Sequence, residues 1–154
     1  MRKHLNIFIA VSIFVIVSSP ANAGTFSGLP NSSITPGAIN TAVTQDNIQS
    51  TICVPGYTKT IRPSSSYTTN LKKSQLSSGY SVNGITSTSY YEEDHLVPLE
   101  VGGNPTSIEN LWPELWSGDY GAHEKDKLEN EIHKLICSNK MSLDAGQKIF
   151  ERDW

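Results

Sequence analysis

The stretch that decides the fold reads DHLVPLEVGG over residues 94–103 and is followed by NLWP over residues 110–113. The first stretch places a carboxylate directly before the imidazole of His95 and ends in a Gly-Gly turn. The second stretch begins with Asn110, fifteen residues after that histidine. A third polar residue, His123, opens a segment whose apolar residues recur at helical spacing. Most of the chain can be read outward from these three features.

The segments on either side of these stretches have the periodicity of short strands and helices. Residues 81–91 are rich in Ser, Thr and Tyr and predict a strand that leads into the 94–103 stretch. Residues 97–101 precede a Gly-Gly-Asn-Pro turn and form either the second arm of a hairpin or an irregular loop. In residues 122–138, Leu and Ile recur at i, i+4, i+7 and i+8, which predicts the clearest helix of the chain.

Further short elements are expected outside this region. Thr44 is a suitable N-cap for a short helix that ends near residues 53–56, and residues 57–62 alternate enough to predict a short strand. Residues 64–78 have apolar side chains at helical spacing and predict an amphipathic helix. Ser142 is the expected N-cap of a last helix near the end of the chain.

Residues 1–23 have the pattern of a secretory signal peptide. A basic start precedes an apolar run over residues 5–17, and the small residues that end at Ala23 predict cleavage there. The apolar run is shorter than the roughly 20 residues of a membrane-spanning helix, so we expect no membrane association after cleavage. The mature chain then consists of an extended or flexible arm over residues 24–40 and one small domain over residues 41–154, in a secreted or periplasmic protein.

The mature chain contains two cysteines, Cys53 and Cys137. Export to an oxidising compartment favours a disulfide between them, and two buried free thiols are the alternative. A loop of this length would add about 4.5 kcal/mol of stability in the chain-entropy model. The disulfide would tie the start of the domain to the end of the predicted 122–138 helix.

The charge of the chain is acidic and unevenly distributed. The formal net charge is −3 at pH 7, and removal of the basic leader makes the mature chain more negative. This excludes the strongly basic footprint of a protein that binds DNA tightly and without specificity. The acids that follow residue 91 either hold a cation or form a solvated surface. Residues 47–91 carry no acid, and their four basic side chains are candidates for contacts with a phosphate backbone: Lys59, Arg62, Lys72 and Lys73.

The polar residues of the central stretches match the needs of phosphodiester hydrolysis. An imidazole such as that of His95 can accept a proton from water near neutral pH. Asp94 and His123 can hold a hard divalent ion with open positions for water and phosphate. The Asn110 amide can hydrogen-bond the backbone near His95 and hold its ring. Because adjacent strand residues point to opposite faces, Asp94 and His95 share one site only where the strand ends or distorts.

Three aromatic residues follow the asparagine closely: Trp112, Trp116 and Tyr120. Exposed rings of this kind can stack on nucleic-acid bases. In the core, or as anchors of a loop, they need no ligand. We expect Trp112 in the core.

The pattern Asp-His-Leu-x-Pro-Leu-x-x-Gly-Gly, then Asn-Leu-Trp-Pro, then Ala-His-x-Lys-Asp-x-Leu-Glu-Asn resembles the HNH endonucleases with a ββα-metal (His-Me finger) core. The run Cys-Val-Pro-Gly-Tyr-Thr and the terminal Arg-Asp-Trp also resemble a group of small secreted bacterial HNH proteins. The likeness covers about residues 38–154, with the core motif at about 85–137. It implies an α+β fold with a hairpin that carries Asp94 and His95, a helix that carries a second ligand, a metal between them, and additional short helices.

Residue by residue, the resemblance implies that Asp94 is a metal ligand, His95 the general base and Asn110 the central asparagine of the motif. Many members have the helical ligand about nine residues after that asparagine, a position that Asp119 occupies here. His123 as the second ligand therefore requires a four-residue insertion, and Asp119 is its main rival. The zinc-binding Cys-x-x-Cys pairs of many HNH proteins are absent, so the disulfide would replace them as the cross-link that stabilises the fold.

The resemblance implies a secreted or periplasmic, metal-dependent endonuclease that acts on DNA, with RNA as a further substrate. One divalent ion is expected, Mg²⁺ first, with Mn²⁺, Zn²⁺ and Ni²⁺ as alternatives. A noncatalytic secreted binding module of the same fold is the main rival. A metallopeptidase is discounted, because Lys127 stands where a His-Glu-x-x-His helix that starts at His123 needs its second histidine. Oligomeric state and base specificity stay open.

Overall fold

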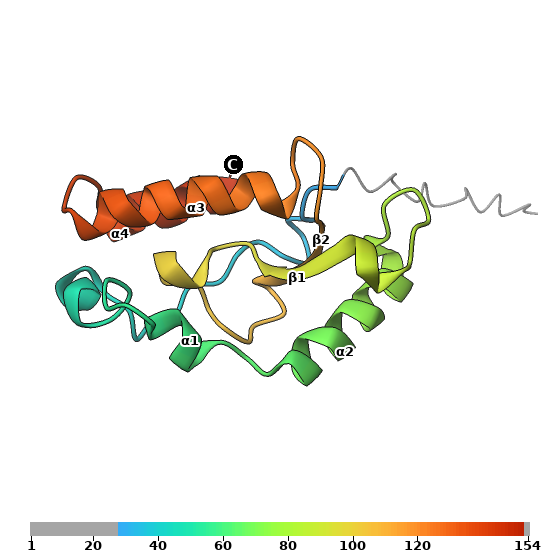
Figure 1. Cartoon of the computed structure of the whole chain (residues 1–154), viewed down its shortest axis with the longest axis horizontal. Coiled ribbons are helices and arrows are strands. Elements are labelled where there is room, and N and C mark those ends of the chain that lie inside the picture. Colours follow the sequence, from blue (N-terminus) through green and yellow to red (C-terminus); the bar gives the residue numbers. More distant parts are fainter. Residues whose placement is uncertain (1–27, 153–154) are drawn as a thin grey trace, which may run out of the picture.

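A pair of antiparallel strands lies between two helical layers (Figure 1). The structure is a computed structural model that describes residues 28–152, so the predicted signal peptide over residues 1–23 lies outside the described residues. Strand β1 is Tyr91–His95 and strand β2 is Leu111–Leu115. The described chain is therefore a mixed α+β fold with a small sheet, as the sequence predicts.

The helices form the layers above and below the strands. In Figure 1 the later helices lie on one side of the strand pair and the earlier ones on the other. The predicted helices over residues 64–78 and 122–138 are confirmed within a few residues, and the backbone N–H of Ala145 donates to the Ser142 hydroxyl, as expected of an N-cap. The bounds are α1 Tyr57–Ile61, α2 Ser65–Gln75, α3 Ala122–Cys137 and α4 Leu143–Arg152, with a 3₁₀ turn, Gln45–Ser50, that begins after Thr44.

The strand predicted over residues 57–62 is wrong, because this segment is the helix α1. Gly56, at φ 87°, reverses the chain in front of the helix. Arg62 is extended, as a residue before proline must be, so Pro63 limits the helix to little more than one turn. A short alternating segment also needs a neighbouring strand to pair with, and β1 pairs with β2.

The strand predicted over residues 81–91 is also largely wrong, since β1 begins at its last residue. Val82 and Ile85 form an isolated bridge around Asn83 and Gly84, which have φ values of 51° and 76°. Two successive positive φ angles in an Asn-Gly pair are typical of a type I′ turn. The chain therefore reverses tightly here, before it enters β1.

The segment 97–101 is the irregular loop rather than a hairpin arm. It contains a 3₁₀ turn, Leu99–Val101, and the true partner of β1 comes later, at β2. The two glycines that follow are needed for this loop. Gly102 has φ 82°, and a Cβ atom on Gly103 would lie 1.8 Å from the Val97 carbonyl oxygen.

The main hydrophobic core joins the N-terminal turn, the 96–103 loop and the helices α3 and α4. Gly146 on α4 allows close packing of these two helices, because a Cβ atom there would lie 2.6 Å from Ile136 Cδ1. Phe150 is almost completely buried beside them. The buried members of this core are Val43, Ile48, Ile52, Val97, Val101, Ile132, Ile136, Leu143 and Phe150.

The predicted disulfide is confirmed. Cys53 and Cys137 are bonded, their Cα atoms lie 5.6 Å apart, and the bridge spans 84 positions of sequence. It ties the end of the N-terminal turn to the last residue of α3. Among the helices of residues 28–152, none is long and apolar enough to cross a membrane.

We expect the double substitution Cys53→Ser and Cys137→Ser to lower the free energy of unfolding by about 4 kcal/mol, because the unfolded chain regains the freedom of a long loop. Urea denaturation followed by circular dichroism, with and without a reducing agent, measures the loss. The Ser variant should be insensitive to the reducing agent. Equal unfolding midpoints for the oxidised and reduced wild type would contradict this role of the bridge.

Candidate functional site

The centre of the candidate site is a buried ammonium group on α3. Lys125 Nζ is fully buried and donates hydrogen bonds to Asp94 Oδ2 at 2.6 Å and to the His95 carbonyl oxygen at 2.8 Å. It also forms an ion pair with Glu129, one helical turn further along α3. One side chain thus connects α3 to the last two residues of β1.

The register of the sheet explains which groups meet this ammonium. Asp94 pairs with Trp112, and Glu92 pairs with Glu114, so the alternation of side chains places these four residues on the same face. Glu114 is completely buried, and neither of its carboxyl oxygens accepts a hydrogen bond from an N–H or O–H donor of the described residues. The acids around Lys125 therefore outnumber it.

Burial and charge set the protonation of this cluster. Burial raises the pKa of Glu114 to about 11, helped by the nearby Asp94 charge, so Glu114 is protonated at neutral pH and can donate to Asp94. Burial also acts to raise the pKa of Asp94. The charge of Lys125 and the hydrogen bonds from Glu114 and Lys125 outweigh this effect, so the pKa of Asp94 is lowered. Burial raises the pKa of Glu129 to about 8 against the pull of Lys125.

The ammonium itself stays charged. Burial alone would lower the pKa of Lys125, yet the carboxylates of Asp94, Glu129 and Glu114 raise it above its ordinary value. An Asp94 carboxylate bonded to a permanent cation is held in one orientation. Its side chain nevertheless keeps 16% of its surface exposed, so Asp94 can be reached from solvent.

His95 ends β1 and is 3% exposed. Its Nε2 atom lies 3.0 Å from the carbonyl oxygen of Pro105. A carbonyl can only accept, so Nε2 carries the proton of the neutral ring and Nδ1 keeps a free lone pair. Burial lowers the pKa of His95, and Arg62 and Lys125 add to this effect, while Pro105 and Asp94 oppose it. The ring is therefore neutral at pH 7 and can take up a proton at Nδ1.

Asn110 is fully buried and braces the loop that surrounds His95. Its Oδ1 atom accepts from the Val97 N–H at 2.8 Å, and its Nδ2 atom donates to the carbonyl oxygens of Val97 and Asn104, each at 3.0 Å. Asn104 directly precedes Pro105, whose carbonyl oxygen accepts the hydrogen bond from His95 Nε2. The amide therefore acts on the imidazole through the backbone, which is the role that the sequence predicts for it.

The two predicted helical ligands lie at the start of α3 and in the loop before it. His123 is an exposed residue in the first turn of α3, and its ring packs against Trp116 with centroids 5.6 Å apart. Asp119 is exposed in the loop before α3. Within residues 28–152, neither shares a hydrogen bond or ion pair with Asp94, whose partner on α3 is Lys125.

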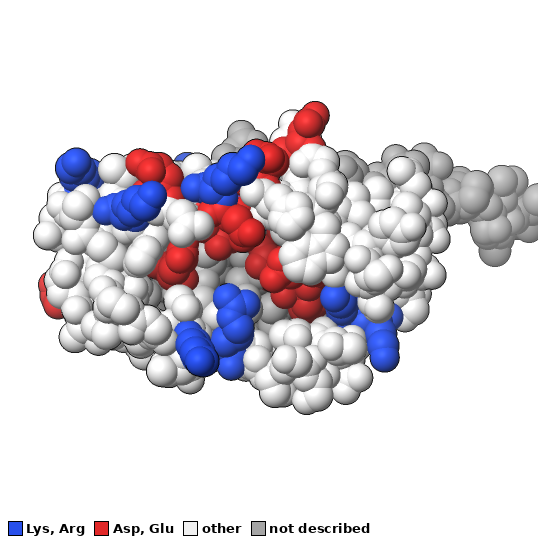
Figure 2. Space-filling view, viewed as in Figure 1, with Lys and Arg blue, Asp and Glu red and all other residues white. Residues whose placement is uncertain are grey.

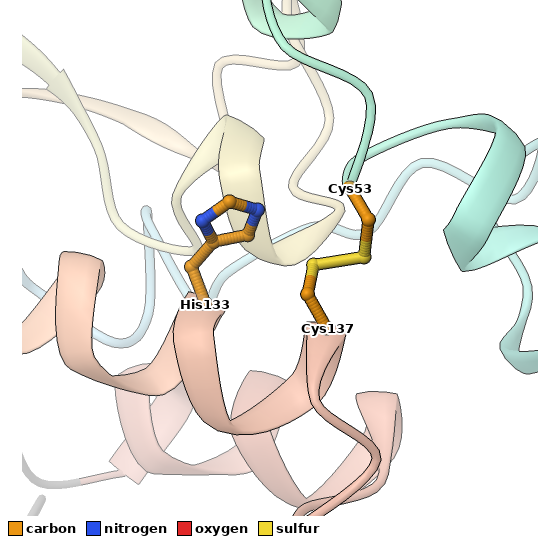
Figure 3. Close-up of side chains that lie close together, drawn as sticks. All are labelled: Cys53, His133 and Cys137. Atoms are coloured by element: carbon orange, nitrogen blue, oxygen red, sulfur yellow. A yellow bond between two sulfur atoms is a disulfide. The ribbon is translucent and has the colours of Figure 1, made fainter.

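A group of potential metal ligands occurs at the other end of α3, where Cys53, Cys137 and His133 lie together (Figure 3). Their ligand atoms lie within 4.8 Å of one another, and no other trio of His, Cys, Asp or Glu in the described chain does so. Both sulfur atoms belong to the disulfide, however, so no thiolate is present to bind a metal. His133 Nε2 lies 3.0 Å from the Ile52 carbonyl oxygen, which gives its ring a structural partner.

The predicted phosphate-contacting residues lie on the opposite helical layer. Figure 2 shows acidic side chains gathered in the hollow between the layer of α3 and the layer of α1 and α2, with Lys and Arg side chains on both sides of it. Arg62 and Lys72 line a groove against β1, whereas Lys59 and Lys73 are exposed and do not line it. The Lys72 ammonium also donates to the Tyr91 carbonyl oxygen at 2.7 Å.

Two acids of β1 also line this groove. Burial raises the pKa of Glu92 to about 7, with the charges of Asp94 and Asp126 adding to the shift. Burial raises the pKa of Glu93 to about 8, although Lys72 opposes it. Each acid is therefore partly or largely protonated near neutral pH, which weakens its repulsion of an anion.

Sequence reasoning missed three members of the cluster: Lys125, Glu129 and Glu114. Lys125 lies seven residues before Ile132 and so continues the apolar stripe of α3 toward its start, which is an unusual place for a lysine. Glu114 follows three buried residues of β2. A charged residue inside an apolar pattern was the available signal in both cases.

We expect Lys125→Met to lower the free energy of unfolding by about 3 kcal/mol, because it leaves buried carboxylates without their cation. The matched control is Lys127→Met, two residues away, whose ammonium pairs with Glu124 on the exposed surface and should change stability by less than about 0.5 kcal/mol. Urea denaturation of the two variants compares them. Equal stabilities would show that Lys125 does not hold α3 to β1.

Comparison of the chain with protein-family models, with curated protein sequences and with solved structures finds no match in any of the three. The likeness to HNH nucleases therefore depends on the sequence motifs alone.

Proposed function

We propose that the mature chain is a metal-dependent endonuclease of the HNH type that hydrolyses phosphodiester bonds of DNA, and of RNA as a further substrate. The observation that carries the proposal is the state of His95. Its Nε2–H is fixed by the Pro105 carbonyl oxygen, and its pKa is lowered, so the neutral ring offers Nδ1 as a base beside the Asp94 carboxylate. A histidine that served only to fill the core would not need a braced loop and an adjacent acid.

The order of elements supports the finer assignment to a ββα-metal fold. Strands β1 and β2 pair directly, and α3 follows β2 and contacts the end of β1 through Lys125. Asp94 and His95 both pair with β2 in regular register, so their side chains leave β1 on opposite faces, and the proposal places the reacting phosphate at the strand end that they share. The disulfide is in keeping with a secreted or periplasmic location.

In the proposed reaction His95 Nδ1 takes the proton of the attacking water. Asn110 keeps the imidazole in place by holding the loop at Asn104, next to the Pro105 carbonyl oxygen that accepts the hydrogen bond from Nε2. This arrangement prevents the ring from presenting its protonated nitrogen to the water. The base is thus prepared before substrate binds, which favours the transition state over the ground state.

The residues around Asp94 fit a hard divalent ion in their chemistry. They offer carboxylate oxygens, and the Glu114 oxygens are buried without an N–H or O–H donor from the described residues. At neutral pH Glu114 and much of Glu129 are protonated and Asp94 balances the charge of Lys125, so a bound ion would have to displace the protons of these two acids. A bound ion, Mg²⁺ by preference, would supply the positive charge that neutralises the phosphate oxygens and the departing 3′ oxygen. The second ligand is proposed to be His123, with Asp119 and now Glu129 as rivals.

A noncatalytic binding module is the second candidate, and one observation favours it. The ammonium of Lys125 already lies among the carboxylates, at hydrogen-bond distance from Asp94. A site whose charge is largely neutralised by its own lysine has less need of a metal. Metal binding without cleavage would support this candidate.

A plasmid-nicking assay of the mature protein in Mg²⁺, Mn²⁺, Zn²⁺ or Ni²⁺ tests the proposal. We expect cleavage that EDTA abolishes, and a loss of about 10²- to 10⁴-fold in His95→Ala because no other group replaces the base. His133→Ala is the matched control, since His133 also has its Nε2 atom 3.0 Å from a carbonyl oxygen. Asp94→Ala, His123→Ala, Asp119→Ala and Glu129→Gln compare the ligands. Cleavage by His95→Ala at the wild-type rate would refute the assignment.

The dependence of cleavage on pH is a separate test of His95. The neutral imidazole is the active form, and burial lowers its pKa below the ordinary 6.5. We therefore expect kcat/KM to be constant near pH 7 and to fall on the acid side with a midpoint below 6.5. Initial rates on a labelled oligonucleotide between pH 4.5 and pH 8 give this midpoint. An acid limb centred above pH 7 would exclude His95 as the base.

A further inference from the structure

The groove beside β1 is lined by residues that the proposed hydrolysis does not use. Its walls are formed by the connection between α1 and α2, by one side of α2 from Ser65 to Lys72, by β1, and by Trp116 directly after β2. Its volume is about 250 Å³, which is small for an enclosed ligand site and suits one unit of a longer chain. The lining includes Arg62, Ser65, Thr68, Lys72, Glu92 and Trp116.

The groove leads to the proposed site. Glu92 lines it and lies on the same sheet face as Asp94, two residues further along β1. Arg62 is exposed, and its guanidinium forms no hydrogen bond or ion pair with another residue of the described chain. Its positive charge still acts on Glu92 and on His95. An anionic backbone held at Arg62 would therefore lie close to the proposed base.

Trp116 gives the groove an aromatic wall that the core does not use. Trp112 is completely buried, whereas Trp116 is half-buried and its ring packs against the exposed His123 at 5.6 Å with an angle of 33° between the planes. Two backbone hydrogen bonds hold the main chain at these two residues: the Trp116 N–H donates to the Tyr90 carbonyl oxygen at 3.0 Å, and the His123 N–H donates to the Trp116 carbonyl oxygen at 3.4 Å. The aromatic surface is therefore held in position before any ligand arrives, which lowers the entropy cost of binding.

We infer that this groove is a subsite for an unpaired nucleotide, with the base stacked on the Trp116 ring and the adjacent phosphate at Arg62. The inference rests on the proposed function and deepens it, because it assigns the substrate as a single-stranded segment of nucleic acid. In a duplex the bases are stacked on each other and offer no free face to a side chain, whereas single strands bind through aromatic stacking and basic grooves. Every base has such a face, so the subsite tolerates different base sequences. Stacking does not involve the sugar, so both DNA and RNA strands are accepted.

Equilibrium binding of fluorescent 12-nucleotide strands tests this subsite without cleavage. The probes are oligo-dT, oligo-U, an abasic strand with the same number of phosphates, and a DNA duplex. The affinity of each probe is measured for the His95→Ala variant, and again for the wild type in EDTA, so that no strand is cleaved during the measurement. Trp116→Ala, Trp116→Phe and Tyr120→Ala are then made in the His95→Ala background. Tyr120 is the matched control, an aromatic residue of the same loop that is 55% exposed and does not line this groove.

We expect Trp116→Ala to weaken binding of the base-bearing single strands by about 5- to 150-fold, the range of one stacked base, and to leave abasic binding unchanged. Trp116→Phe should keep most of the affinity, and Tyr120→Ala all of it. Arg62→Ala should weaken abasic and base-bearing strands alike and reduce the salt dependence. Tighter binding of the duplex, an equal loss on abasic strands in Trp116→Ala, or no binding of any strand would overturn the inference. These results hold whether or not the wild type cleaves, so they are separate from the test of His95.

Discussion

The fold of the site depends on one buried ammonium group. Lys125 reaches from α3 to Asp94 and to the backbone of His95, and Glu129 holds it from the same helix. Without this cation, the acids at the centre of the molecule would repel each other and favour solvent. The lysine thus fixes the position of α3 relative to β1.

A second constraint acts on the other side of β1. The side-chain oxygen and nitrogen of Asn110 both hydrogen-bond the backbone of the loop after His95. Gly103 allows that loop to approach Val97 closely. These contacts fix Pro105, which in turn fixes the imidazole. The acid and the histidine are therefore held by separate supports, a side-chain cation for Asp94 and a braced loop for His95, although they are neighbours in the sequence.

The elements that the sequence predicts well are those with a long repeat or a local chemical requirement. The 16-residue helix α3 and the disulfide belong to this group. The strand positions were predicted poorly, because short alternating segments such as 57–62 become strands only where a partner is available. In the site, Asp94 and His95 end β1 and Asn110 hydrogen-bonds the loop that follows them, while their catalytic roles stay predictions. Lys125 and Glu114 were missed because their pairing is a long-range contact that no local pattern records.

The bridge between Cys53 and Cys137 makes the stability of the fold depend on whether its surroundings are oxidising or reducing. It closes the end of α3 farthest from the proposed base, and it joins the N-terminal turn to the helix that carries Lys125. A newly made chain in a reducing cytoplasm lacks this link and spends more time unfolded. A hydrolytic site of the kind proposed here would then be complete only in an oxidising compartment.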